Sequence, residues 1–164
     1  MKMNKSIKKE LEKWLLDAER VVVAGIGNPI RMDDYIGVIV ARNLRGRVSE
    51  KVLLIECETL PESYMQQIVD FKPTHILLVD AALLGLNPGE VKLIESKDMN
   101  FSSVFSTHAL PLKIFCECLA EMTGAKIMLL LIQPKEIDFG EKVTPEVLAS
   151  GKEIADLLSE ILPH

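Results

Sequence analysis

The sequence is poor in cysteine, in aromatic residues and in positive charge. Its 164 residues include three cysteines, one tryptophan and 5% aromatic residues, and the formal net charge is -5. The cysteines are odd in number and lack metal-finger spacing, so the sequence indicates neither a disulfide framework nor a zinc finger. Binding to nucleic acid calls for a basic face, and this composition gives no such electrostatic footprint.

Long hydrophobic runs are absent too. The longest covers residues 127–132 and is far shorter than the roughly 20 residues that a membrane span needs. No apolar segment follows the basic N-terminus, so the sequence indicates no signal peptide. We therefore expect a cytoplasmic protein without membrane insertion, in which the cysteines are reduced.

What the sequence does contain is an alternation of helical patterns with short apolar runs. Apolar runs predict buried strands over 20–25, 52–57, 75–79 and 126–133. Residues 90–95 alternate polar and apolar side chains and follow the third run without a crossover helix, so that strand is antiparallel or at an edge. The predicted fold class is α/β: a three-layer α/β/α sandwich on a mostly parallel five-stranded sheet with one antiparallel strand.

Apolar residues at helical spacing predict the helices that cover this sheet. They extend over 6–18, 35–44, 62–71, 110–122 and 145–162. Thr144 is the expected N-cap of the last helix. A chain of this length is expected to form one domain, spanning residues 1–164.

The stretch 21–34 lies at the centre of the predicted site. Its apolar run stops at Gly25 and Gly27, and a short loop delivers Asp33 and Asp34 to the start of the next helix. A dinucleotide fingerprint is disfavoured, because Ile30 replaces the third small residue and two carboxylates would repel a pyrophosphate. Two acids before a helix can also serve only as caps that oppose the helix dipole.

Three polar side chains are placed to meet at one edge of the predicted sheet. Asp34 follows the first strand, Asp80 closes the third, and His108 precedes the helix over 110–122. Parallel strands place their carboxyl ends along one edge, so these side chains can converge. Two carboxylates and an imidazole suit a divalent transition metal with positions left for water or substrate. Simpler roles stay open: a helix cap for Asp34, an arginine or backbone partner for buried Asp80, and a hydrogen-bonded loop position for His108.

Other groups near this edge are weaker candidates. Glu56 and Glu58 close the second predicted strand and can be solvated loop residues. Cys57 lies where a nucleophile could sit, but no sequence feature activates it, and no G-x-S-x-G elbow occurs. His75 begins a strand far from this edge and His164 is terminal, so we set both aside.

Several short blocks resemble the hydrogenase maturation endopeptidases, which remove a C-terminal extension from the large subunit of [NiFe] hydrogenases. Residues 25–28 and 33–37 match the signature G-x-G-N followed by D-D/E-x-x-G. Further blocks follow in the right order at 79–81, 85–90, 107–112 and 132–134. The turn at 85–90 and the T-H-x-x-P-L segment at 107–112 are most similar to the hydrogenase-3 branch.

The resemblance implies an α/β/α sandwich with a mixed five-stranded sheet and an aspartic-type endopeptidase activity. It places the metal-binding acid of the family on Asp34, its second carboxylate on Asp80 and its histidine on His108. The family usually has Asp-Gly-Gly-Ser/Thr after its second strand, where this chain has Glu-Cys-Glu-Thr at 56–59. We therefore expect a different local loop there. Residues 1–19, with an additional N-terminal helix, lie before the usual start of the family.

The function expected from this resemblance is cleavage of a large-subunit precursor after nickel insertion. Asp34, Asp80 and His108 would recognise nickel that the precursor already holds, and Asp33 or Glu56 would act as base or support. The H-E-x-x-H pair of zinc proteases is absent, which disfavours a permanent catalytic zinc. We expect a monomer whose partner is the precursor, with no nucleotide cofactor. A non-catalytic nickel chaperone or docking protein is the alternative class.

Overall fold

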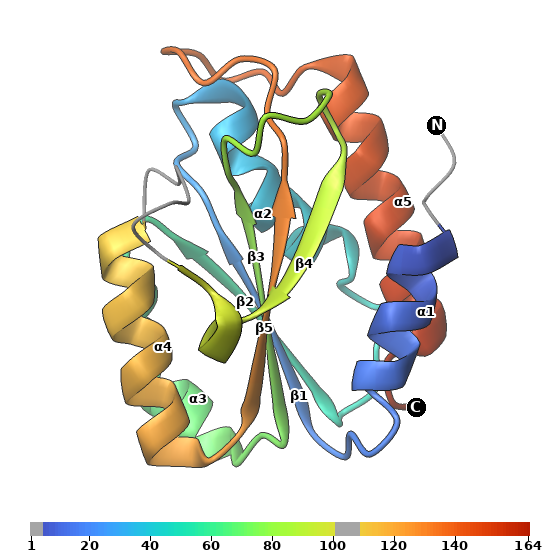
Figure 1. Ribbon diagram of the computed structural model, residues 1–164, viewed down its shortest axis with the longest axis vertical. Coiled ribbons are helices and arrows are strands. Elements are labelled where there is room, and N and C mark those ends of the chain that lie inside the picture. The colour runs from blue at the N-terminus through green and yellow to red at the C-terminus, as the bar shows by residue number, and fades with distance from the viewer. Residues whose placement is uncertain (1–4, 101–108) are drawn as a thin grey trace.

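The computed structural model describes residues 5–100 and 109–164, including the side chains of all of them except 109–111. It contains a five-stranded sheet with helices packed on both faces (Figure 1). The strand order is β2-β1-β3-β5-β4, in which β4 runs antiparallel to β5 and the other neighbours are parallel. The strands are β1 (Val21–Ile26), β2 (Val52–Glu58), β3 (His75–Ala81), β4 (Val91–Glu95) and β5 (Lys126–Ile132).

Helices cover both faces of the sheet, so the predicted three-layer sandwich is confirmed. Apolar side chains of three helices pack on one face and those of two helices on the other. The first layer consists of α1 (Lys5–Trp14), α2 (Ile36–Asn43) and α5 (Pro145–Ile161), and the second of α3 (Met65–Phe71) and α4 (Ala109–Thr123). Short 3-10 helices are η1 (Met32–Tyr35), η2 (Pro61–Tyr64) and η3 (Ser96–Asp98).

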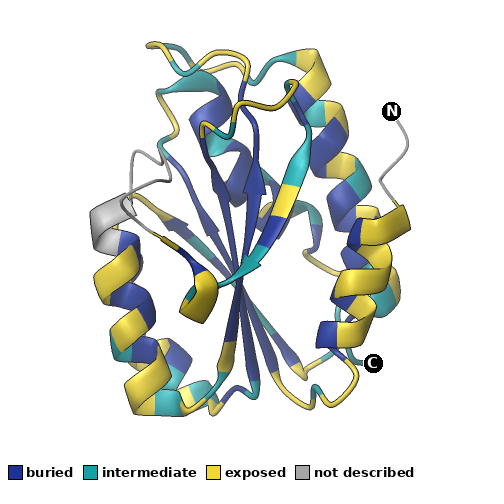
Figure 2. Cartoon of the chain, viewed as in Figure 1, coloured by how far each residue is buried: buried dark blue, intermediate teal, exposed yellow. Residues whose placement is uncertain are grey.

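Burial of the strands follows their sequence patterns. β1 and β3 are buried at every residue, and β5 at every residue after Lys126 (Figure 2). These central strands carry continuous apolar runs because helices cover them on both faces. β4, in which polar and apolar residues alternate, is the predicted antiparallel strand at one edge. No helix in the described part of the chain is long and apolar enough to cross a membrane.

The N-terminal helix is shorter than its sequence pattern predicts. The apolar spacing predicts a helix over 6–18, but α1 ends at Trp14. A tight hydrogen bond of 3.0 Å from the Ala18 amide to the Leu15 carbonyl then turns the chain toward β1. Trp14 packs edge-on against His75 at the start of β3, with ring centroids 4.8 Å apart. The helix therefore covers the amino-terminal end of the parallel strands.

The first turn of α2 lies directly on the carboxyl ends of β1 and β3. A Cβ atom on Gly37 would lie 2.1 Å from the carbonyl oxygen of Val79 and 2.4 Å from that of Ile26. A Cβ atom on Gly25 would lie 2.2 Å from the carbonyl oxygen of Gly37. Side chains cannot be accommodated at such distances, so glycine at both positions allows the backbones of helix and strands to touch.

Gly37→Ala is expected to destabilise the fold by about 3 kcal/mol, because the added methyl group meets the backbone of two central strands. Gly151→Ala is the matched control in α5, since the nearest atoms to a Cβ there belong to side chains, the end of Ile36 at 2.6 Å and Val40 at 3.6 Å. Replacing a helical glycine also recovers about 1 kcal/mol of helix propensity. Urea unfolding measures both variants, and equal stabilities would contradict the argument from backbone contact.

Candidate active site at the carboxyl edge of the sheet

The turn after β1 brings Asp34 back to the strand that it follows. A Cβ atom on Gly27 would lie 2.3 Å from the carbonyl oxygen of Asp34, so only glycine lets the turn close on η1. The amide of Asn28 donates a hydrogen bond of 3.0 Å to Oδ2 of Asp34, which is buried. Gly25 and Gly27 both serve backbone packing, a role different from the phosphate turn of a dinucleotide site.

Asp80 lies in the strand next to β1. β3 pairs with β1 in parallel, with Val79 opposite Gly25, and it continues to Ala81 instead of ending at Asp80. Asp80 is buried, and its Oδ1 accepts a hydrogen bond of 2.9 Å from the amide of Ala81. It pairs with Leu131 of β5, whose side chain packs in the layer of α3 and α4. The Asp80 carboxylate therefore points toward that layer.

The third predicted residue, His108, lies outside the described residues. The helix that follows it, α4, begins at Ala109 and covers the face toward which Asp80 points. No three histidine, cysteine, aspartate or glutamate side chains within 5–100 and 109–164 are grouped to hold a metal ion. The structure brings Asp34 and Asp80 to one edge, and the role of all three residues as metal ligands stays a prediction.

Glu56 points away from Asp80. It lies on the same face of β2 as Leu54, which packs in the layer of α1, α2 and α5. Arg42 of α2 approaches its Oε1 with Nη2 at 3.0 Å, and Arg45 binds its Oε2. Glu56 thus anchors α2 to the edge strand, and the structure does not bring it together with Asp80.

The end of β2 carries a bulge within residues 56–59, where the sequence predicts a loop different from the usual Asp-Gly-Gly-Ser/Thr loop. Pairing with β1 shifts between Gly25 and Ile26, which face Glu56 and Glu58. Glu58 has a φ of 53°, a left-handed conformation that costs a residue other than glycine roughly 1–2 kcal/mol. The backbone therefore keeps, at Glu58, a conformation that suits the second glycine of the usual family sequence. Bulges of this kind frequently adjoin active sites.

Asp33 braces the loop at 134–144. Its Oδ2 accepts hydrogen bonds from the amides of Lys135 at 2.8 Å and Glu136 at 2.9 Å, and from the hydroxyl of Thr144 at 2.8 Å. Its Oδ1 accepts a fourth from the Thr144 amide at 2.6 Å. Thr144 occupies the predicted N-cap position of α5, but its hydroxyl binds Asp33 instead of the helix. No sequence signal marked this role, because the partners lie 102 to 111 residues away.

Backbone contacts complete this brace. Met32 donates from its amide to the carbonyl of Gly140 over 2.9 Å, and the Gly140 amide donates to the carbonyl of Ile30 over 2.9 Å. The Arg31 Nε donates to the Ile137 carbonyl over 3.2 Å. The loop after β5 is therefore docked along its length on the loop after β1.

Gln133 holds the neighbouring loop at 82–90. Its Oε1 accepts hydrogen bonds from the amide of Leu84 at 2.6 Å and from that of Leu86 at 3.3 Å. The hydroxyl of Ser150 in α5 donates to the carbonyl of Gly89 over 2.6 Å. Gln133, with Ser150 of α5, therefore fixes the loop that follows Asp80.

Cys57 lacks the properties of a nucleophile. Its side chain is buried, and burial, with a smaller contribution from the nearby charge of Glu62, raises the pKa of the thiol to about 12. The reactive form of a cysteine is the thiolate, which is scarcely populated at neutral pH with such a pKa. The nucleophile alternative therefore finds no support at Cys57.

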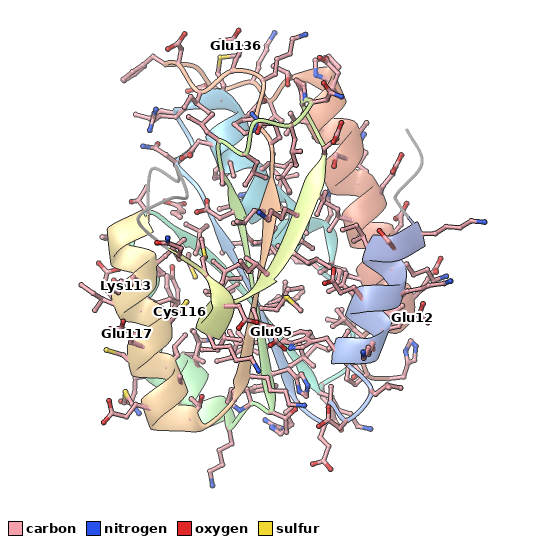
Figure 3. All side chains as sticks on the ribbon, in the orientation of Figure 1. Glu12, Glu95, Lys113, Cys116, Glu117 and Glu136 are labelled. Atoms are coloured by element: carbon pink, nitrogen blue, oxygen red, sulfur yellow. The ribbon has the colours of Figure 1, made fainter. Side chains whose placement is uncertain are left out.

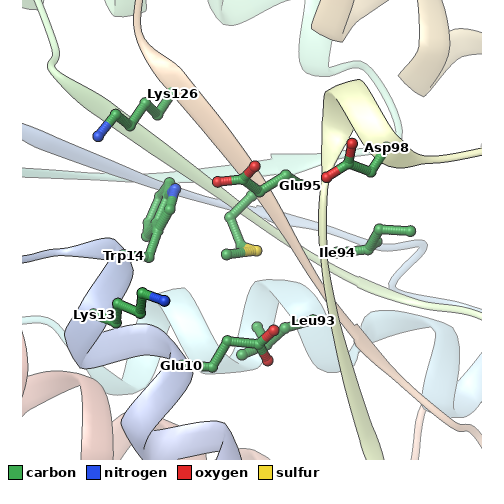
Figure 4. A pocket seen from close by; sticks show the side chains of 9 residues that line it. Glu10, Lys13, Trp14, Leu93, Ile94, Glu95, Asp98 and Lys126 are labelled. Atoms are coloured by element: carbon green, nitrogen blue, oxygen red, sulfur yellow. The ribbon is translucent and has the colours of Figure 1, made fainter.

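Two hollows lie at the end of the sheet where the parallel strands begin, opposite the candidate site. One, of about 440 Å³, lies between α1 and β4 and is lined by Trp14, Glu95 and Lys126 among others (Figure 4). The second, of about 460 Å³, shares Glu95 and Lys126 and extends to the end of α4. Figure 3 shows Glu136, in the loop that Asp33 braces, far above Glu95. Neither hollow includes Asp34 or Asp80.

The structure defines an α/β/α protein whose candidate site lies at the carboxyl edge of its sheet, and comparison with known proteins identifies its family. The sequence profile described as hydrogenase maturation protease matches residues 38–162. The crystal structure of a [NiFe] hydrogenase maturation protease from Thermococcus kodakarensis is 35% identical and covers 93% of this chain and 98% of its own, with a TM-score of 0.87.

Curated relatives agree with this match. Hydrogenase 3 maturation protease of Escherichia coli is 30% identical over 126 residues, which are 77% of this chain and 80% of that protein. A Methanocaldococcus jannaschii protein named in the same family is 38% identical over 157 residues, 90% of this chain and 91% of its own. This chain belongs to the hydrogenase maturation protease family and is an enzyme of the protease class.

Asp33→Asn is expected to destabilise the protein by about 2–3 kcal/mol, since it turns an amide donor toward groups that donate hydrogen bonds to Asp33. Asp138→Asn is the matched control, because Asp138 is exposed in the same loop. Thermal unfolding followed by circular dichroism measures both variants. Equal midpoints would show that Asp33 does not brace the loop.

Iodoacetamide is expected to alkylate Cys118 in the folded protein before Cys57 or Cys116. Cys118 is partly exposed, whereas the other two are buried and burial raises the pKa of each thiol to about 12. Peptide mass mapping at successive times, with a urea-unfolded sample as control, measures the order. Rapid alkylation of Cys57 in the folded protein would restore it as a candidate nucleophile.

Proposed function

We propose that this chain removes the C-terminal extension from the large-subunit precursor of a [NiFe] hydrogenase after nickel insertion. The relatives include a [NiFe] hydrogenase maturation protease and a hydrogenase 3 maturation protease. In this proposal Asp34, Asp80 and His108 recognise nickel that the precursor already holds. Nickel is then part of the substrate, and the reaction uses no nucleotide.

The observation that carries this proposal is a pair of buried carboxylates at the carboxyl edge of the sheet, Asp34 in η1 after β1 and Asp80 in the adjacent strand β3. Asp34 and Asp80 are each oriented by a backbone amide, at 3.0 Å and 2.9 Å. Two carboxylates at one edge of the sheet attract positive charge, which favours a cation held by a partner. Oxygen ligands and an imidazole are a suitable set for a divalent transition metal, and this edge is where open α/β sheets bind ligands.

Orientation is the main catalytic contribution in this proposal. Recognition of the loaded precursor by Asp34, Asp80 and His108 fixes the scissile peptide bond at the carboxyl edge of the sheet. Water adds to the carbonyl carbon of that bond, the carbon–nitrogen bond breaks, and the proton given up by the water passes to the leaving amine. Asp33 supports this arrangement through the loop at 134–144, because its four hydrogen bonds are all made to that loop.

The proposal also includes a cytoplasmic, monomeric protein. Cys57, Cys116 and Cys118 are free thiols, which suits a reducing compartment. The aspartic-type assignment follows from Asp34 and Asp80 as the acidic residues that engage the substrate.

Asp34→Ala, Asp80→Ala and His108→Ala are each expected to slow cleavage of the nickel-loaded precursor by roughly 100-fold or more, since a misplaced scissile bond loses the benefit of orientation. The mass of the precursor over time, measured by mass spectrometry, gives the rate. Circular dichroism of each variant controls for folding. Cleavage by all three folded variants at the wild-type rate would refute the assignment of these residues.

The same measurement separates a protease from a nickel chaperone. A chaperone would bind the precursor and leave its mass unchanged, whereas the proposed activity shortens it at the C-terminus. Nickel-free precursor is the matched control and is expected to stay intact. Equal cleavage of nickel-free and nickel-loaded precursor would contradict recognition of the metal and leave the protease activity in place.

A further inference from the structure

Exposed apolar side chains gather at the carboxyl edge of the sheet. Eight large hydrophobic side chains are exposed in the described part of the chain, and five of them follow parallel strands. We call these five the apolar rim: Ile30 after β1, Leu60 after β2, Leu83 and Leu86 after β3, and Phe139 after β5. Single exposed apolar residues are ordinary, but several at one place mark a surface that binds something.

The loops that carry the rim are held in place by hydrogen bonds. Phe139 precedes Gly140, whose amide donates to the carbonyl of Ile30 over 2.9 Å, so these two loops lie side by side. Gln133 holds the loop of Leu83 and Leu86 through its Oε1. A partner that docks on fixed loops loses little conformational entropy at the interface. The rim is therefore preorganised for association.

The charge around the rim is mainly negative. Its loops carry five exposed acids: Glu58, Glu62, Glu136, Asp138 and Glu141. The exposed bases there are Lys135 and Lys142, and Lys135 is paired with Glu146 at 2.7 Å. Complementary charge favours a partner whose contact surface carries lysine or arginine beside apolar groups.

We propose that the apolar rim is the surface on which the large-subunit precursor docks, through an apolar segment flanked by basic residues. This inference rests on the proposed function and names the contact surface for its substrate. Ile30 belongs to the turn that positions Asp34, and Leu83 lies three residues after Asp80. The docking surface therefore adjoins the candidate site along the chain at both carboxylates.

The test compares rim variants with variants of equal exposure elsewhere. Phe139 is 85% exposed and Leu16, beside α1, is 83% exposed, while Leu60 is 56% and Ile114 of α4 is 55% exposed. Phe139→Ser and Leu60→Ser are each expected to weaken precursor binding and raise KM about tenfold, with kcat unchanged. Leu16→Ser and Ile114→Ser are expected to match the wild type. Binding is measured by calorimetry with the nickel-loaded precursor, and cleavage by mass spectrometry.

The outcomes distinguish failure of the docking surface from failure of the proposed function. If the wild type cleaves the precursor and the rim variants behave like the controls, the docking surface is wrong and the function stands. If the wild type binds the precursor without cleaving it, the proposed function is wrong. The dissociation constants of the same variants then still show whether the precursor docks on the apolar rim. If the wild type does neither, both are overturned.

Two further results would also overturn the proposal. The acidic surroundings predict that precursor binding weakens as ionic strength rises, and binding that strengthens with salt would contradict a basic partner segment. Sedimentation of the wild type alone tests for a second copy as the occupant. Self-association that Phe139→Ser abolishes would assign the rim to a dimer interface instead.

Discussion

The structure depends most on the direct backbone contact between the first turn of α2 and the ends of β1 and β3. Gly25 and Gly37 leave no side chain between helix and strands, and a Cβ on either would lie within 2.2 Å of a carbonyl oxygen. Because this contact is so close, η1 begins beside the strand end, and the amide of Asn28 reaches the Asp34 carboxylate. The position of the Asp34 carboxylate thus depends on glycine at positions 25 and 37.

Asp33 and Asp34, which are adjacent in η1, form different hydrogen bonds. Asp33 directs both carboxylate oxygens to the loop at 134–144, which it holds with four hydrogen bonds. Asp34 turns back to the end of β1. Successive residues of a tight turn project in different directions, so the two carboxylates make different contacts. The family signature contains both acids, and the structure gives each a separate physical reason to be there.

The two ends of the sheet also differ in what they carry. The carboxyl edge holds the candidate site, the apolar rim and the loops tied together by Asp33 and Gln133. The amino-terminal end of the parallel strands holds α1, which packs Trp14 on His75, and two hollows lined by Lys126. This separation follows from the parallel strand direction, since loops after parallel strands all emerge on one side.

Apolar periodicity and local motifs report on short stretches of chain. They are enough to predict the fold class, the antiparallel edge strand, the family and the places of Asp34 and Asp80 at the carboxyl edge. Long-range contacts, in contrast, are what turn Glu56 toward the arginines of α2. Such contacts also join Asp33 to residues more than 100 positions away and place five exposed apolar side chains from four loops at one edge of the sheet. A side chain in a strand changes face with a shift of one residue, so direction depends on register, bulges and long-range contacts that no local pattern contains.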